Sequence, residues 1–166
     1  ETAMIGKWHL KSEPTGFNYW KILKGQGEYY NPLIVDSAGE RNVEGYVTDI
    51  ITNLAIETLE NRDKDKPFAM LLHHKAPHRN WMPNLKYLGA FKGKKFPLPE
   101  TFYDDYSTRS LAAKESDMRI DNMFLTWDMK LRPGDIEQET GSGGSGQVSG
   151  MIRDSYREWM NDEQRK

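Results

Sequence analysis

The sequence predicts an α/β domain whose mainly parallel sheet is flanked by helices. Two observations indicate this class. An apolar run at residues 2–5, a helical stripe at residues 47–61 and a second apolar run at residues 68–72 follow one another. No hairpin turn joins these elements, so a helical crossover is expected to connect strands that run in the same direction. The 166 residues are enough for one domain with a core.

The first strand is expected at residues 2–5, which are short and apolar and run into the string Gly-Lys-Trp-His. Residues 12–42 are rich in Gly, Pro, Asn and Tyr without periodicity, which predicts long loops with a short hairpin around Tyr29 and Tyr30. Aromatic residues in this stretch favour an ordered structure, either as core residues or as the lining of a substrate cleft. They are Phe17, Tyr19, Trp20, Tyr29 and Tyr30.

The helix at residues 47–61 is predicted by apolar residues at helical spacing, with Thr48 and Asp49 suited to its first turn. A charged turn that ends in Pro67 stops it. The apolar run at residues 68–72 is then typical of a strand buried on both faces. The apolar positions of the helix are Val47, Ile50, Ile51, Leu54, Ala55 and Leu59.

The second half of the chain is less regular. Residues 81–101, rich in proline and lysine, are expected to run over the surface, and residues 107–128 show a looser helical pattern. Residues 129–150 are expected to be a flexible loop or join, because residues 141–146 consist only of Gly and Ser. Residues 151–166 predict a terminal amphipathic helix.

Composition excludes several classes of function. The formal net charge of −2 provides no global attraction to nucleic acid or to an anionic membrane, so neither is an expected partner. The chain has no cysteine, which excludes disulfides, thiolate catalysis and cysteine-ligated zinc. No apolar run approaches the roughly 20 residues of a membrane-spanning helix. Because the net charge does not attract anions, any anion site must be a local group of positive charges.

All four histidines lie in two short strings, at residues 6–10 and 73–78. In a strand Lys7 and His9 would share one face, where an ammonium and an imidazole can hold a tetrahedral anion and move a proton. Both strings follow a predicted strand, and ligands of open α/β sheets gather outside the carboxyl ends of strands. The two strings could therefore converge on one anion site. The alternative is a strand end whose polar residues merely face water.

The second string also raises the question of a metal. His74 and His78 are four residues apart, as in the helical zinc motif, but Pro77 disfavours a helix there and no glutamate lies between them. A zinc site in a loop and a charged turn with hydrogen-bonded histidines remain the alternatives.

Four segments together resemble the sulfatase family. Residues 4–10 look like a family signature, a hydrophobic strand that ends in Gly-Lys-Trp-His, and residues 68–83, with Ala-Pro-His at their centre, look like the family's strand and histidine loop. Residues 14–20 and 25–32 are similar to bacterial sulfatases of sulfated glycans, including N-acetylglucosamine-6-sulfatase-like members. The likeness extends over residues 1–128, which are interpreted as a partial sulfatase catalytic domain.

The resemblance implies an alkaline-phosphatase-like α/β fold that hydrolyses sulfate esters of glycans. It also implies a calcium ion and a formylglycine nucleophile, made from Cys or Ser in a Cys/Ser-x-Pro-x-Arg motif. Carried over to this sequence, Lys7 would contact the sulfate and the nucleophile. His9 would lie near the formylglycine hydrate and help to release sulfate from it. His78 would bind sulfate and assist the leaving oxygen.

The sequence departs from the family pattern at the nucleophile. It has no cysteine, and the nearest string, at residues 12–16, has Gly16 where arginine is required. The metal ligands and a second catalytic lysine are expected before Glu1 and after Lys166. The expectation is an internal piece of a periplasmic or secreted sulfatase, with part of the sulfate site, no cofactor held by its own residues and no turnover alone. Its partners would be a sulfated glycan or sulfate ion and the remainder of the parent protein.

Two other functions stay open. One is a phosphatase or phosphodiesterase of the same superfamily, which normally needs clustered Asp and His ligands for two metals. The other is a non-catalytic glycan-binding module that uses the aromatic loops.

Overall fold

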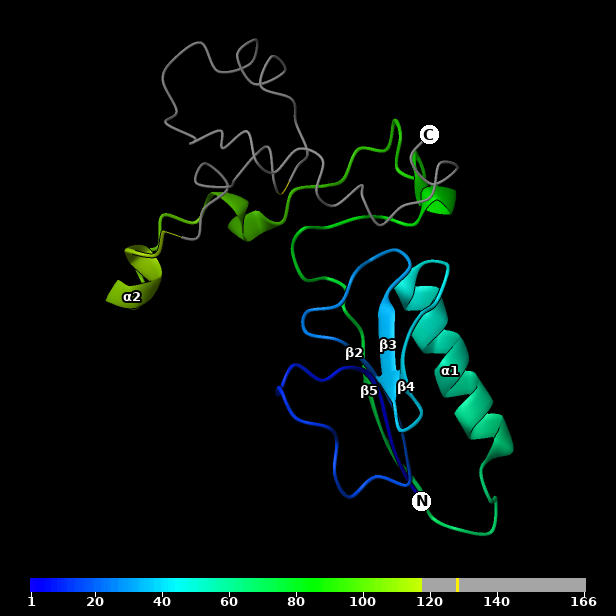
Figure 1. The fold of residues 1–166 in the computed structure, drawn as a ribbon. Helices are drawn as coiled ribbons and strands as arrows, with labels where there is room; N and C mark the ends of the chain where they lie inside the picture. Colours follow the sequence, from blue (N-terminus) through cyan, green and yellow to red (C-terminus); the bar gives the residue numbers. More distant parts are fainter. Residues whose placement is uncertain (118–127, 129–166) are drawn as a thin grey trace. The chain divides into compact units, whose positions relative to one another are not determined.

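The computed structural model describes residues 1–117 and residue 128. The described chain falls into two units, of which the first is Glu1–Met82 and the second begins at Pro83. The first unit holds one five-stranded sheet and one long helix (Figure 1). Its elements are β1 (Thr2–Lys7), β2 (Tyr19–Leu23), β3 (Leu33–Asp36), β4 (Gly39–Asn42), α1 (Val47–Asn61) and β5 (Ala69–His73).

The strands lie in the order β4-β3-β2-β1-β5. β1 is at the centre of a parallel group, because it pairs in parallel with both β2 and β5. β3 runs antiparallel to β2 and to β4. The predicted α/β class is confirmed. The sheet is mixed, with two parallel and two antiparallel pairings, where a mainly parallel sheet was expected.

The helix α1 has the bounds that its periodicity predicts, and Asp49 lies in its first turn. Val47, Ile51 and Ala55 are its buried residues, one helical turn apart on the face that packs against the sheet. Figure 1 shows α1 running alongside the strands of this unit. The core joins these three side chains to residues from the strands and from the loop before α1, namely Ile5, Leu23, Tyr29, Tyr30 and Ile34.

The prediction for residues 12–42 was wrong. The stretch contains β2, β3 and β4 instead of long loops, and the hairpin turn lies at residues 37–38 instead of Tyr29 and Tyr30. The strands have four or five residues each, too few for a clear alternation of apolar and polar positions. The two tyrosines are buried in the core, which agrees with the first of the two roles considered for the aromatic residues.

Asp36 holds the β3–β4 turn, which Gly39 closes with a φ of +120°. The Oδ1 of Asp36 accepts a hydrogen bond from the backbone N–H of Ala38 at 3.0 Å, and its Oδ2 accepts one from Arg41 at 2.6 Å. The hydrogen bond from Arg41 is the main reason why the pKa of Asp36 lies below its ordinary value. A short polar side chain that bonds to the backbone two residues later is a common turn device, but it gives a weak sequence signal.

We expect Asp36→Asn to lower the free energy of unfolding by about 1 kcal/mol at pH 7, since it removes a partly exposed ion pair. A carboxylate with a lowered folded-state pKa contributes stability above its unfolded value, about pH 4, and loses it as the pH falls through the folded value. The wild-type advantage should therefore shrink as the pH falls below the unfolded value and through the lower folded value. Urea unfolding at several pH values measures this, with Asp65→Asn, in an exposed turn, as the charge-matched control. An unchanged difference at low pH would contradict the assignment.

The strand β5 forms where predicted, but its burial was predicted wrongly. It lies at the edge of the sheet, and its burial pattern is mostly exposed. Leu71 and Leu72 are 44% and 40% exposed, and the preceding Phe68 is 47% exposed. A continuous apolar run is typical of a central strand. The run itself does not show how many strands of the described chain lie beside it.

The second unit contains only short elements in its described part. They are the 3₁₀ helices Leu85–Tyr87 and Glu100–Tyr103 and the helix α2 (Leu111–Lys114). Of the helix predicted at residues 107–128, the described residues 107–117 show only α2 and no helix at residues 107–110 and 115–117, and residues 118–127 lie outside the described residues. So do the Gly/Ser segment at 141–146 and the helix predicted at 151–166. None of the described helices is both long and apolar enough to cross a membrane.

Candidate functional site

The two histidine strings leave the sheet side by side. β1 and β5 are parallel neighbours, and Gly6 is paired with His73 in their register. The Nδ1 atom of His73 lies 3.2 Å from the carbonyl oxygen of Lys7. The strings at residues 6–10 and 73–78 therefore emerge at the carboxyl ends of adjacent strands, the edge at which a ligand site was expected.

Gly6 permits this close approach of the two strands. Its φ is +102°, a backbone conformation that side chains rarely tolerate. A Cβ atom added at Gly6 would lie 1.9 Å from the carbonyl oxygen of His73. The glycine that precedes Lys7 in the string is thus required by the backbone of the neighbouring strand.

The prediction that Lys7 and His9 share one face assumed that both lie in a strand, but His9 lies beyond the end of the strand. β1 ends at Lys7, and His9 has a left-handed backbone with φ of 50°. The side-chain amide nitrogen of Gln26 lies 3.2 Å from Nδ1 and 3.3 Å from Nε2 of its imidazole. A non-glycine residue in the left-handed region costs of order 1–2 kcal/mol. His9 is exposed in this conformation, with Gln26 as its hydrogen-bond partner.

His78 lies in the tight turn that follows β5. Its backbone N–H donates to the carbonyl of Lys75 at 3.0 Å, and its Nδ1 contacts the carbonyl oxygen of Arg79. The hydroxyl of Tyr29 donates to the carbonyl of His78 at 2.6 Å. The indole of Trp81 donates to the carbonyl of Pro77 at 2.7 Å, so two aromatic side chains hold this turn.

Lys75 is the site residue that sequence reasoning missed. It is only 7% exposed, and its ammonium donates to the backbone carbonyl of Gln26 at 3.3 Å. The same ammonium lies 4.9 Å from the centroid of the Tyr29 ring. The signal was in the sequence, since Lys75 stands among the histidines of its string as Lys7 stands beside His9. Its burial could not be read from that position.

The electrostatics of the site are set by burial and by three charged groups. Burial lowers the pKa of Lys75, the neighbouring Glu28 carboxylate opposes that shift, and the positive charge of Lys7 adds to it. Burial raises the pKa of Glu28, and Lys75 counteracts this. Burial also raises the pKa of Tyr29 to about 12, so its hydroxyl stays a neutral donor. Two lysines against one carboxylate leave this edge suited to an anion.

The donor set does not fit a metal centre. In the part of the chain that the structure describes, no group of three or more His, Asp or Glu side chains could hold a metal ion. A zinc site built from His73, His74 and His78 is therefore not supported. The absence of cysteine and of a Ser-x-Pro-x-Arg motif leaves no residue that fits a formylglycine precursor. We derive no step through calcium or formylglycine from these residues.

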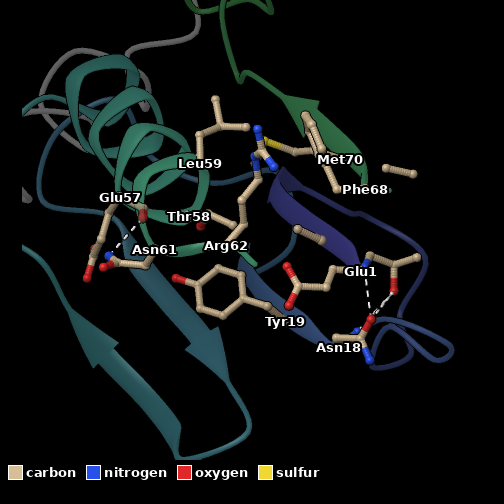
Figure 2. Close-up of a pocket in the computed structure, with 13 residues that line it drawn as sticks. Glu1, Asn18, Tyr19, Glu57, Thr58, Leu59, Asn61, Arg62, Phe68 and Met70 are labelled. Carbon is tan, nitrogen blue, oxygen red and sulfur yellow. Dashed lines mark hydrogen bonds between the residues drawn. The ribbon is translucent and has the colours of Figure 1, made fainter. Parts of the chain in front are cut away.

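A pocket of about 310 Å³ lies at the other end of the sheet, lined by the amino ends of β1 and β5 and the last turn of α1. Arg62, which directly follows α1, points its side chain toward Met70 in this pocket (Figure 2). Its guanidinium carbon is 4.6 Å from the centroid of the Phe68 ring. Lys7 is at the opposite end of β1, roughly 16 Å along the strand. This pocket is distinct from the predicted anion site.

Comparison with known proteins identifies the family. The sulfatase family model matches residues 1–128. An N-acetylglucosamine-6-O-sulfatase of Bacteroides thetaiotaomicron is 53% identical over 135 residues, which is 79% of this chain. The human N-acetylglucosamine-6-sulfatase is 29% identical over 98 residues, or 56% of this chain. A solved structure of a protein in complex with its substrate D-glucosamine-2-N,6-O-disulfate is 43% identical, with a TM-score of 0.70 over 99% of this chain.

The matches cover only part of each relative. The chain spans 24% of the bacterial sulfatase, 18% of the human one and 35% of the chain in the solved structure. The family model nevertheless matches more than half of the present chain, and it includes both histidine strings. The chain therefore belongs to the sulfatase family.

Proposed function

We propose that this chain contributes Lys7, His9 and His78 to the sulfate site of an enzyme that hydrolyses the 6-O-sulfate ester of a glucosamine or N-acetylglucosamine residue. The observation that carries the proposal is the 53% identity to an N-acetylglucosamine-6-O-sulfatase. The similar structure that holds a sulfated glucosamine supports the same substrate class. The two strings lie at adjacent strand ends, as a shared anion site requires.

The roles of the three residues follow from their chemistry and from the family. The ammonium of Lys7 is a compact positive charge that can bind sulfate oxygens. The imidazole of His78 can bind sulfate and give a proton to the leaving alcohol oxygen, so that a neutral alcohol departs. His9 would assist the release of sulfate. The convergence of these side chains on one anion stays a prediction.

The remainder of the parent protein would complete the site within a larger alkaline-phosphatase-like domain. We propose that it supplies the nucleophile and the calcium ligands, and that the parent is periplasmic or secreted, as the family implies. The isolated chain would then bind sulfate or a sulfated sugar without hydrolysing it. Its interactions with the anion are few, and a dissociation constant near 1 mM, about 4 kcal/mol of binding free energy, is expected.

We expect Lys7→Ala to weaken sulfate binding by the 166-residue chain about tenfold, because a charge-assisted contact is worth roughly 1.4 kcal/mol or more. Chemical-shift titration with sodium sulfate at constant ionic strength measures the effect. Lys66→Ala is the matched control, because it removes the same charge at the opposite end of β5. There Lys66 pairs with Asp63. Equal affinities of the two variants would overturn the proposal.

The substrate class is tested by comparing D-glucosamine 6-sulfate with D-glucosamine. The proposal requires that only the sulfated sugar binds and that Lys7→Ala lowers the affinity for this sugar. Equal binding of both sugars would instead indicate a glycan-binding module. Hydrolysis of an aryl sulfate by the isolated chain, lost in Lys7→Ala or His78→Ala, would show that the chain has a nucleophile of its own. The assay should be run with and without calcium.

A further inference from the structure

Lys75 is a buried charge that the roles of Lys7, His9 and His78 leave unexplained. Among the described residues it is the one buried lysine. Burying an ammonium group is costly unless it is hydrogen-bonded or paired. A methionine of similar length would fill the same space without that cost, so the charge of Lys75 calls for a role in the site.

The first contact of Lys75 leads to His9. Its ammonium donates to the backbone carbonyl of Gln26, and the side-chain amide of Gln26 lies against both ring nitrogens of His9. The turn that presents Gln26 is tight, because the N–H of Gly27 donates to the carbonyl of Lys24 at 3.0 Å. A shift of this turn would therefore move the amide away from the imidazole.

The second contact leads to His78. The ring of Tyr29 faces the Lys75 ammonium, and its hydroxyl holds the carbonyl of His78 at 2.6 Å. Lys75 also lies within the same turn as His78, whose N–H donates to the Lys75 carbonyl. One buried side chain is thus joined to the surroundings of both histidines, which come from segments about 70 residues apart.

We propose that Lys75 is a positioning residue of the sulfate site. It holds the Gln26 turn against His9, and it holds Tyr29 where its hydroxyl bonds to the His78 carbonyl. This inference rests on the proposed function, because it assumes that the two histidines serve one anion. Lys75 itself does not bind the anion. It is 7% exposed, and its ammonium is directed to the Gln26 carbonyl. Its positive charge interacts with that of Lys7.

The test compares Lys75→Met, Gln26→Ala and the double variant in the 166-residue chain, with Lys66→Met as the charge-matched control. Two quantities are measured by NMR: sulfate affinity, and the ¹⁵N shifts of the His9 imidazole, which report its tautomer. We expect Lys75→Met to weaken sulfate binding roughly threefold to tenfold, because the two histidines would be less well positioned while no direct contact with the anion is lost. We also expect it to move the His9 shifts in the same direction as Gln26→Ala does.

The double variant shows whether the effect of Lys75 on His9 passes through Gln26. If Lys75 acts on His9 through Gln26, the double variant should show the same His9 shifts as Gln26→Ala alone. Additive changes would overturn the positioning role, as would weaker sulfate binding with unchanged His9 shifts, which would indicate a purely electrostatic effect. Gln26 is exposed, so Gln26→Ala keeps the test open if Lys75→Met does not fold. Unmoved His9 shifts in Gln26→Ala would then overturn the inference.

The failure of this inference is distinguishable from the failure of the proposed function. If Lys7→Ala weakens sulfate binding while Lys75→Met behaves as Lys66→Met does, the sulfate site stands and the positioning role is wrong. If Lys7→Ala also leaves the affinity unchanged, the proposed function is wrong, and the positioning role falls with it.

Discussion

Gly6→Ala is expected to destabilise the chain by about 3 kcal/mol or more, the range of the most damaging single substitutions. The added methyl group would lie 1.9 Å from the carbonyl oxygen of His73. The obstacle is backbone, so no side-chain rotation relieves it, and the ends of β1 and β5 must separate. Urea unfolding measures the loss of stability. Because Lys7 follows directly, we also expect sulfate binding to disappear.

Gly16→Ala separates the clash from the backbone strain. Gly16 has a φ of +80°, close to that of Gly6, but a Cβ atom there meets nothing within 4 Å. This variant should lose only about 1 kcal/mol, the cost of a left-handed alanine. The difference between the two variants measures the contact with His73. Equal losses in both would show that the strands do not approach as closely as described.

Ile51→Ala is expected to lower the free energy of unfolding by about 3–4 kcal/mol, as is typical when a buried isoleucine is truncated. Ile51 is completely buried in the core, among side chains from β1, β2 and β3. The cavity would lie where α1 meets the sheet. The strands around it are paired on both sides, so their backbones have little freedom to close the gap. Thermal and urea unfolding monitored by circular dichroism measure the effect.

Ile56→Ala is the matched control in the same helix. Ile56 is 47% exposed, so its truncation removes little buried area. Alanine also has a higher helix propensity than isoleucine, and the net change should lie within about 0.5 kcal/mol of zero. A large loss in this variant as well would show that α1 packs with a different face.

The elements predicted correctly are those with strong local signals. The helix at residues 47–61 has an apolar stripe long enough to fix its period and its ends, and the structure gives it the same bounds. The strand before Lys7 is short but continuously apolar, and it is central in the parallel group. The family motifs also lie on these elements and on β5. Fold class and family therefore followed from sequence.

The missed elements depend on non-local information. β2 lies beside β1, but its five residues include Lys21 and no clear alternation. β3 and β4 are held by the Asp36 turn, which uses one side chain and one glycine rather than a glycine pair. The exposure of β5 depends on which strands lie beside it in the described chain. None of these is encoded in a local period.

The parts of the site that were missed are contacts across the fold. Lys7, His9 and His78 could be named from their strings, but the pairing of His9 with Gln26 joins residues 17 positions apart. The bond from Lys75 to the same glutamine spans 49 positions. Such contacts depend on the conformation of the loop that carries Gln26. A sequence pattern identifies the residues but does not predict that conformation.

We expect the connectivity of the sheet to set the order in which the site forms during folding. The β3–β4 hairpin joins Asp36 to Gly39 across a two-residue turn, whereas Thr2 pairs with Ala69, 67 positions later. Hairpins close in about 1–10 μs, while pairing between distant segments must first overcome the entropy of a long loop. We expect the β1–β5 junction to be among the last contacts to assemble. Affinity for sulfate would then appear only in the final step of folding, after most of the secondary structure is present.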